Sequence, residues 1–351
     1  MEIDRSKPVL VTGATGFVAG WIVKKLLDEG LTVHAAVRNP DNKEKIKHLD
    51  ELAANAPGSI KYFKSDLLEK GSYAEAMDGC ELVFHTASPF VLDVKDPQKD
   101  LIDPAVKGTE NVLEQANLTP SVKRVVLTSS CAAIYTDTVD TEKAPGGRIT
   151  EEIWNNTASL DYQPYSFSKT LAEKEAWKIA KAQDRWDLVV INPSFVMGPA
   201  LNPKTTTSES YRVLKQMGSG AMKMGIPNIG FGVIDVRDLA EAHFKAGFTA
   251  SAHGRNIISG HNTNLVEMVH PIYEKYHKQY PMSKRALPKW MVWTFGPMLD
   301  KALERKYISR NVNHKFTADN SKAVKELGLQ FRPLDQTMVE SFDALVENKI
   351  I

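Results

Sequence analysis

Tyr165 and Lys169 stand four residues apart in a strongly helical segment, so they share one face of the predicted helix. A tyrosine hydroxyl can protonate an alkoxide as a hydride arrives, but its unperturbed pKa of about 10 makes it a poor base at neutral pH. The ammonium of Lys169 favours the phenolate and can also bind a ribose hydroxyl of a nicotinamide cofactor. Because Tyr-x-x-x-Lys also occurs on ordinary helix surfaces, its meaning depends on the rest of the chain.

Ser130 supplies the third group of this chemistry. The apolar segment 124–128 predicts a strand that ends at Ser129-Ser130. A serine hydroxyl at this place can donate to a substrate carbonyl and hold it for attack. Ser130, Tyr165 and Lys169 together form a set suited to the interconversion of carbonyls and alcohols, and a set of this kind needs a hydride donor.

A glycine turn near the start of the chain predicts where that donor binds. The apolar strand 9–12 stops at Gly13, and Gly13-x-x-Gly16-x-x-Ala19 opens a helical pattern. Glycines let a turn approach a ligand closely, and the first N–H groups of the helix favour a phosphate. The spacing is a variant of the dinucleotide fingerprint. We therefore place cofactor contacts at Gly13, Thr15, Gly16, Phe17 and Val18.

The end of the next predicted strand, 31–37, bears on the choice of cofactor. An acidic residue there would accept from a ribose 2′-OH, whereas an arginine suits a 2′-phosphate. This chain has Arg38, followed by Lys45. The two cations favour NADPH over NADH. The alternative is that both are solvated charges at the start of a helix.

Later strands, 60–64, 82–85 and 186–191, end near further polar positions. Ligands of open parallel sheets lie beyond the carboxyl ends of the strands. We expect Asp66 and Leu67 to flank the adenine, and Thr86, Ala87 and Ser88 to lie near the pyrophosphate and ribose. Burial disfavours a charged imidazole, so His85 is expected to be a neutral packed side chain rather than a catalyst.

Strands alternating with helices predict an α/β fold with a doubly wound parallel sheet of the Rossmann type. We assign residues 1–196 to the dinucleotide-binding domain, with 233–260 returning to it, and 197–351 mainly to a smaller substrate-binding region. Segments rich in Gly and Met from Leu201 onward indicate mobile substrate-side loops. Within 201–232, Met222 and Phe231 are the residues expected to influence substrate choice.

Composition limits the partners. The 351 residues carry 44 Lys and Arg against 43 Asp and Glu, so neither nucleic acid nor an anionic membrane is implied, and no protein partner is indicated. Cys80 and Cys131 fit neither a disulfide framework nor a metal site, and the charged N-terminus favours a cytoplasmic protein. The apolar stretch 290–299 contains a proline and is too short to span a membrane, so we expect it to pack in the core or in the substrate domain.

Five motifs, at 12–17, 85–90, 127–130, 165–173 and 235–238, resemble the extended short-chain dehydrogenase/reductase family. The similar branch contains dihydroflavonol reductase, cinnamoyl-CoA reductase and fungal methylglyoxal and ketone reductases. The resemblance implies NADPH-dependent reduction of an aldehyde or ketone, with the family's serine, tyrosine and lysine at Ser130, Tyr165 and Lys169. Ala19 departs from the family's usual glycine. The cofactor contacts implied or expected are Phe17, Arg38, Asp66, Leu67, Thr86, Pro193 and Val196.

Two other functions stay open at this point. A nucleotide-sugar epimerase or dehydratase on the same fold would retain NAD through its cycle, and Arg38 argues against it. An NADP-sensing regulator would keep the fold without catalysis. The intact set of Ser130, Tyr165 and Lys169 argues against that alternative, because function resides in site residues rather than in the fold.

Overall fold

The computed structural model describes residues 1–88, 94–300 and 302–351. Its centre is a seven-stranded sheet with the order β10-β6-β5-β4-β1-β2-β3, and all its pairs are parallel. The predicted doubly wound fold is thus confirmed, and the strand order reverses between β1 and β4. The strands are β1 (Val9–Thr12), β2 (Thr32–Val37), β3 (Ser59–Lys64), β4 (Leu82–His85), β5 (Arg124–Thr128), β6 (Asp187–Pro193) and β10 (Gly254–Ile258).

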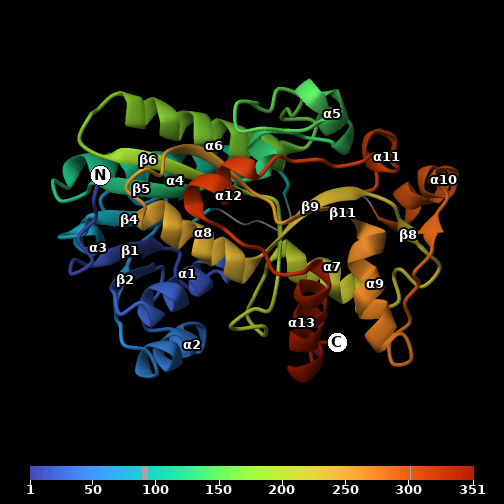
Figure 1. The fold of residues 1–351 in the computed structure, drawn as a ribbon, viewed down its shortest axis with the longest axis horizontal. Helices are drawn as coiled ribbons and strands as arrows, with labels where there is room; N and C mark the ends of the chain where they lie inside the picture. The colour runs from blue at the N-terminus through green and yellow to red at the C-terminus, as the bar shows by residue number, and fades with distance from the viewer. Residues whose placement is uncertain (89–93, 301) are drawn as a thin grey trace.

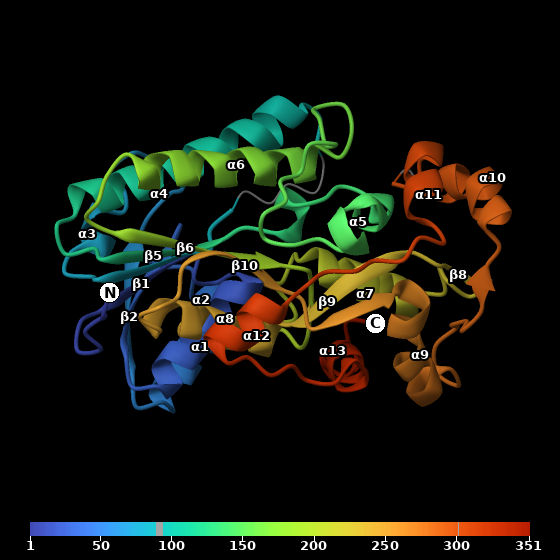
Figure 2. The ribbon, with the colours of Figure 1, turned by 45° about the horizontal axis from the view of Figure 1, so that its top comes forward.

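Helices cover both faces of this sheet, as Figures 1 and 2 show. One face carries α1 (Phe17–Asp28), α2 (Lys43–Ala54), α8 (Val236–Phe248) and α12 (Ser321–Leu327). The other carries α3 (Ala74–Met77), α4 (Asp103–Leu118), which follows the π-helical turn η1 (Gln98–Ile102), and α6 (Pro164–Lys181). Between β5 and α6 lie η2 (Cys131–Ala133), α5 (Thr138–Lys143) and η3 (Pro145–Gly147).

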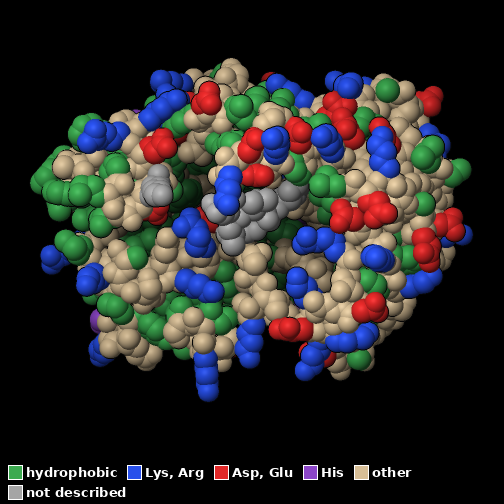
Figure 3. All heavy atoms as spheres, turned by 180° about the vertical axis from the view of Figure 1, so that it is seen from behind, with side chains coloured by type: hydrophobic (Ala, Val, Ile, Leu, Met, Phe, Trp, Pro, Cys, Tyr) green, Lys and Arg blue, Asp and Glu red, His purple; other side chains and the backbone are tan. Residues whose placement is uncertain are grey.

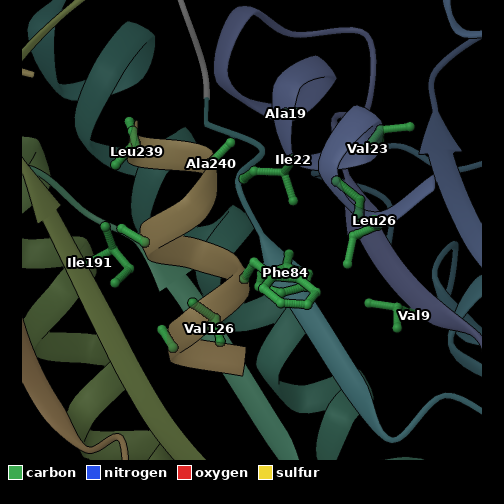
Figure 4. Close-up of a cluster of buried hydrophobic side chains, with 14 of the residues drawn as sticks. Val9, Ala19, Ile22, Val23, Leu26, Phe84, Val126, Ile191, Leu239 and Ala240 are labelled. Atoms are coloured by element: carbon green, nitrogen blue, oxygen red, sulfur yellow. The ribbon is translucent and has the colours of Figure 1, made fainter. Parts of the chain in front are cut away.

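Alternation along the strands builds a core on each side. On β1, Val9 belongs to the cluster under α1 and α8, whereas Leu10 belongs to the cluster under α4 and α6. Figure 4 shows Phe84 of β4 in the first cluster, close to Ile22 and Leu26 of α1. Because both faces are buried, the strands read as continuous apolar runs rather than as alternating ones.

A second group of elements lies beyond the carboxyl edge of the central sheet (Figure 1). A three-stranded sheet, in the order β11-β9-β7, is packed by three helices. The elements of this group are β7 (Phe195–Met197), α7 (Glu209–Gly218), β8 (Ile226–Pro227), β9 (Gly230–Asp235), β11 (His261–Asn264), α9 (Leu265–Tyr276), β12 (Ala286–Leu287), α10 (Lys289–Leu299), α11 (Arg305–Asn311) and α13 (Leu334–Glu347). The loops expected after Leu201 are therefore interrupted by a helix, α7, whose Met217 is buried.

The expected packing of 290–299, in the core or in the substrate domain, applies to only one narrow stripe of its side chains. Within α10 only Val292 and Gly296 are buried, while Trp290 is 65% and Met298 82% exposed. The reason is geometric: Val292 and Gly296 are four residues apart and form one narrow stripe, and a peripheral helix can bury only that stripe. Figure 3 shows hydrophobic side chains gathered at this end of the molecule, with basic side chains beside them. Within the described ranges, no helix has both the length and the apolar character needed to cross a membrane.

Candidate active site

Ser130 is the second residue after the carboxyl end of β5 and is fixed by its own backbone neighbours. Its hydroxyl oxygen accepts from the N–H of Ala132 at 3.1 Å and so caps the turn η2. Since this contact uses an acceptor lone pair, the hydroxyl proton is free to be donated elsewhere.

Tyr165 lies in the first turn of α6, whose start is tightly defined. Gln163 has the left-handed backbone conformation φ 54, ψ 55, and Pro164 occupies the first helical position. Protein atoms around the Tyr165 hydroxyl raise its pKa, a hydrogen bond from Ser130 lowers it, and the charge of Glu209 raises it. The residue as a whole keeps 47% of its surface exposed. Tyr165 is therefore a protonated phenol, partly exposed and next to Ser130.

Lys169 follows one helical turn later on the same face of α6. Its Nζ donates to the Ser88 hydroxyl at 2.8 Å and lies 5.8 Å from the centre of the Tyr165 ring. Burial lowers the pKa of Lys169 to about 8. The ammonium is thus placed between the turn after β4 and the ring of the tyrosine.

The glycine turn has the features of a pyrophosphate cradle. Gly13 has φ +65, and an added Cβ would lie 3.2 Å from Cα of Ala87 in the turn after β4. The Thr12 hydroxyl accepts from the N–H groups of Thr86 (3.1 Å) and Ala87 (3.0 Å) and holds the two turns together. Helix α1 begins after Gly16 with no side-chain cap and no acidic residue in its first turn. Its N–H groups and positive end of the dipole fit an anionic ligand.

The predicted adenosine contacts gather at the neighbouring strand ends. Arg38 directly follows β2 and Asp66 lies just after β3; both act on the phenol of Tyr73, whose pKa is raised mainly by burial, further raised by Asp66 and lowered by Arg38. Both side chains are exposed, as is Lys45 on α2, one element further along. The remaining predicted contacts lie at or beyond the ends of β1, β3, β4 and β6, with Pro193 the last residue of β6 and Val196 within β7: Thr15, Phe17, Val18, Leu67, Ser88, Pro193 and Val196. Residues 89 and 90 of the predicted motif lie outside the described residues.

Two buried histidines lie next to this edge, and His85 lines a small cavity together with Ser88 and Lys169. The prediction for His85 is confirmed: it is 1% exposed, its Nδ1 lies 3.1 Å from the Thr12 hydroxyl, and burial lowers its pKa to about 3. His243 of α8 was not singled out by the sequence. Its Nε2 lies 2.7 Å from the Thr128 hydroxyl, and burial lowers its pKa to about 4. Both are neutral structural groups at physiological pH.

The second group of elements packs directly against the cofactor turn. Phe17 meets Tyr211 of α7 edge to face, with ring centres 5.8 Å apart. Phe231 stacks on Phe195 at 5.8 Å, and Met222 packs in the same cluster. The influence of Glu209 on Tyr165 places the start of α7 near the phenol. The region expected to hold the substrate therefore adjoins both the cradle and Tyr165.

Sequence analysis missed a buried polar cluster behind the site. Glu173, Asn192 and Arg255 are all fully or nearly fully buried, and hydrogen bonds join them to the serine pair at 129–130. The only signal in the sequence was that Glu173 continues the four-residue spacing of Tyr165 and Lys169. No group of three or more His, Cys, Asp or Glu suited to a metal occurs among the described residues.

Comparison with known proteins places this geometry in a family. Residues 9–259 match the model of the NAD dependent epimerase/dehydratase family. The chain belongs to this family. The match agrees with the predicted membership of the extended short-chain dehydrogenase/reductases, and it includes the glycine turn, Ser130, Tyr165 and Lys169.

Individual relatives extend over nearly the whole chain. A cinnamoyl-CoA reductase of Medicago truncatula is 39% identical over 345 residues, covering 97% of this chain and 96% of the relative. A bifunctional dihydroflavonol 4-reductase/flavanone 4-reductase of Malus domestica is 32% identical, with 97% and 91% covered. Among solved structures, yeast methylglyoxal/isovaleraldehyde reductase Gre2, complexed with NADPH, superimposes with a TM-score of 0.79 at 27% identity, covering 98% of this chain and 100% of that one.

Proposed function

We propose that this protein is an NADPH-dependent reductase that converts an aldehyde or ketone to the alcohol. The observation that carries the proposal is the meeting of Ser130 and Tyr165, from separate elements, beside the ammonium of Lys169. The relatives named above are reductases by their printed names, which supports the reaction type.

The cradle supports a dinucleotide, and the adenosine end supports NADPH. When bound, this cofactor supplies the hydride. The open N-terminus of α1 and the positive φ of Gly13 suit its pyrophosphate. Arg38 offers a planar cation at the end of β2, where a 2′-phosphate can accept paired hydrogen bonds. The NADPH complex of the yeast structure is consistent with this choice.

The side chains divide the work of reduction. Ser130 donates its hydroxyl proton in a hydrogen bond to the substrate oxygen and orients the carbonyl. Tyr165 transfers its phenolic proton to the same oxygen as negative charge develops there. Lys169 stabilises the phenolate that remains, because an adjacent cation favours the charged form of the phenol. The partly buried rings of Phe17, Phe195 and Phe231 supply an apolar wall for the substrate.

The test combines a substrate panel with one conservative variant. Oxidation of NADPH is followed with small dicarbonyls, aromatic aldehydes, β-ketoesters and dihydroflavonols. For the best substrate, Tyr165→Phe keeps the ring and loses only the proton donor, so turnover should fall roughly 10²–10⁴-fold with NADPH affinity nearly unchanged. Tyr273→Phe, which removes a hydroxyl on α9, is the matched control and should leave turnover unchanged.

Two outcomes would contradict the proposal. If Tyr165→Phe kept more than about half of wild-type turnover with chemistry rate-limiting, Tyr165 would not be the proton donor. If the whole panel gave no turnover although NADPH bound, the site would be one that binds the cofactor without reducing these carbonyls.

A further inference from the structure

Glu173 continues the active face of α6 into the protein interior. It follows Lys169 by one turn and Tyr165 by two, and four-residue spacing keeps the three on one side of the helix. Unlike the other two, Glu173 is only 1% exposed. A buried carboxylate requires compensating donors, so its partners show what it is positioned to hold.

Both oxygens of Glu173 accept hydrogen bonds from other elements. Oε2 accepts from the Ser129 hydroxyl at 2.5 Å and from Asn192 Nδ2 at 2.8 Å, whereas Oε1 accepts from Arg255 Nε at 2.6 Å and from Trp177 Nε1 at 3.3 Å. Three of these donors stand at the end of β5, on β6 and on β10. The carboxylate therefore joins the helix that carries Tyr165 to three strands of the sheet.

Two partners of Glu173 reach the segment that contains Ser130. Asn192 Nδ2 also donates to the carbonyl of Ser130 at 3.2 Å. One terminal nitrogen of Arg255 donates to the carbonyls of Glu151 (2.8 Å) and Ile153 (2.6 Å), and the other reaches the carbonyl of Ala133 at 3.4 Å. The turn that begins at Ser130 is thereby held on both sides.

The amide of Asn192 shows that the carboxylate sets this arrangement. Its Oδ1 is buried and makes no hydrogen bond within the described residues. Reversing the amide would direct Oδ1 of Asn192 toward Glu173 Oε2 and the Ser130 carbonyl, both of which are hydrogen-bond acceptors. The orientation that leaves Oδ1 without a donor is favoured because it gives Nδ2 to the carboxylate and to the Ser130 carbonyl.

We propose that Glu173, with Arg255 as its counter-ion, is the positioning residue that sets the distance between the Ser130 hydroxyl and the Tyr165 phenol. This inference rests on the proposed function, because it concerns the geometry of that reaction. A buried ion pair by itself contributes little net stability compared with apolar packing, so a geometric role accounts better for its presence here. A displacement of about 1 Å in a reacting group can lower a rate 10²-fold.

Strands β5 and β6 supply a control pair at their other ends, away from Ser129 and Asn192. Arg124, at the start of β5, pairs with Asp187, at the start of β6, through contacts of 2.7 and 2.8 Å. Arg124 is fully buried, whereas the Asp187 side chain is 38% exposed, so this pair tests the loss of an acid at the other end of the β5–β6 ladder from Ser130 without matching the burial of Glu173. Glu173→Gln and Asp187→Asn each neutralise the acid of one pair. Their comparison separates positioning from general support of the sheet.

The experiment measures kcat, KM and thermal unfolding for both variants. Glu173→Gln should lower kcat roughly tenfold to a hundredfold with the carbonyl KM changed less than about threefold, because binding is retained and alignment is lost. Asp187→Asn should lower the melting temperature and leave kcat within about twofold of wild type. In a Tyr165→Phe background, Glu173→Gln should lower kcat by less than about threefold, since the group being aligned is already absent.

The outcomes separate the two proposals. Wild-type kcat in Glu173→Gln, when Tyr165→Phe is inactive, would overturn the positioning role alone, as would full additivity of the two substitutions. Retained turnover in both single variants would overturn the proposed function. If Glu173→Gln does not fold, Ser129→Ala removes one hydroxyl donor of the cluster; it should lower kcat about threefold or more, and an unchanged kcat would overturn the role.

Discussion

Acid should unfold this protein earlier than its carboxylates alone would require, because His85 and His243 are held neutral. Burial lowers their pKa values to about 3 and about 4 from an ordinary value of 6.5. The unfolded chain therefore binds more protons as pH falls below 6.5, so this stabilisation is present above pH 6.5 and is lost toward pH 4 and 3. At pH 5, which is about 1.5 pH units below the ordinary pKa, each histidine lowers the free energy of unfolding by about 2 kcal/mol. The two together lower it by about 4 kcal/mol.

Urea unfolding at pH 7 and pH 5 measures this loss. His243→Gln removes one titrating ring while keeping an amide near the Thr128 hydroxyl, so the loss between the two pH values should shrink by about 2 kcal/mol. Taking the difference between variant and wild type cancels the groups that titrate in both. His277→Gln replaces an exposed ring on the surface after α9 and should leave the loss unchanged. Equal pH dependence in His243→Gln and wild type would refute the reasoning.

Three further outcomes are expected. Arg38→Asp should lower kcat/KM for NADPH by about tenfold to a hundredfold, which corresponds to the loss of one charge-assisted hydrogen bond, and it should leave the use of NADH equal or improved. Steady-state kinetics with both cofactors measures this change. Equal efficiency of the wild-type protein with NADPH and NADH would contradict the prediction. Since burial lowers the pKa of Lys169 to about 8, reduction should decline as its ammonium is lost above that pH, and Lys169→Arg should move the decline upward in a pH–rate profile. Met298→Ser should change the free energy of unfolding by less than about 0.5 kcal/mol, because Met298 is 82% exposed, whereas Val292→Ala on the same helix should cost about 1–3 kcal/mol in urea unfolding.

The central sheet was predictable because its strands and helices carry local signals. Buried parallel strands are continuous apolar runs, and Gly13, Gly16 and the helical pattern after them define the first turn. The short strands outside the central sheet carry no such signal. In the three-stranded sheet β7 has three residues and β11 four, although β9 has six, and β8 and β12, which form a separate pair, have two residues each. Segments so short show no measurable periodicity, and they pair only with partners that the rest of the fold brings near.

The site divides in the same way between local and distant relations. Tyr165 and Lys169 were found because helix geometry fixes residues four apart, and Ser130 because it follows an evident strand. The partners of Glu173 could not be found by that reasoning. Arg255 contacts Glu173 across 82 positions of sequence, and only the pairing of β10 with β6 brings it there. The positions of Glu173 and Arg255 in the sequence do not indicate that their side chains are in contact.

Residue type also fails to predict burial where a hydrogen-bonding partner, or a position at the edge of the molecule, determines how exposed a side chain is. Arg255 carries a charge yet is 7% exposed, because Glu173 and three backbone carbonyls replace the hydrogen bonds it had with water. Trp290 is aromatic yet 65% exposed, because α10 needs only Val292 and Gly296 to fill the space beside α11. The general preference of apolar groups for burial holds on average. At Arg255 and Trp290 the arrangement of elements distant in sequence decides burial instead of the residue type. At Arg255 the same arrangement also positions Ser130 relative to Tyr165.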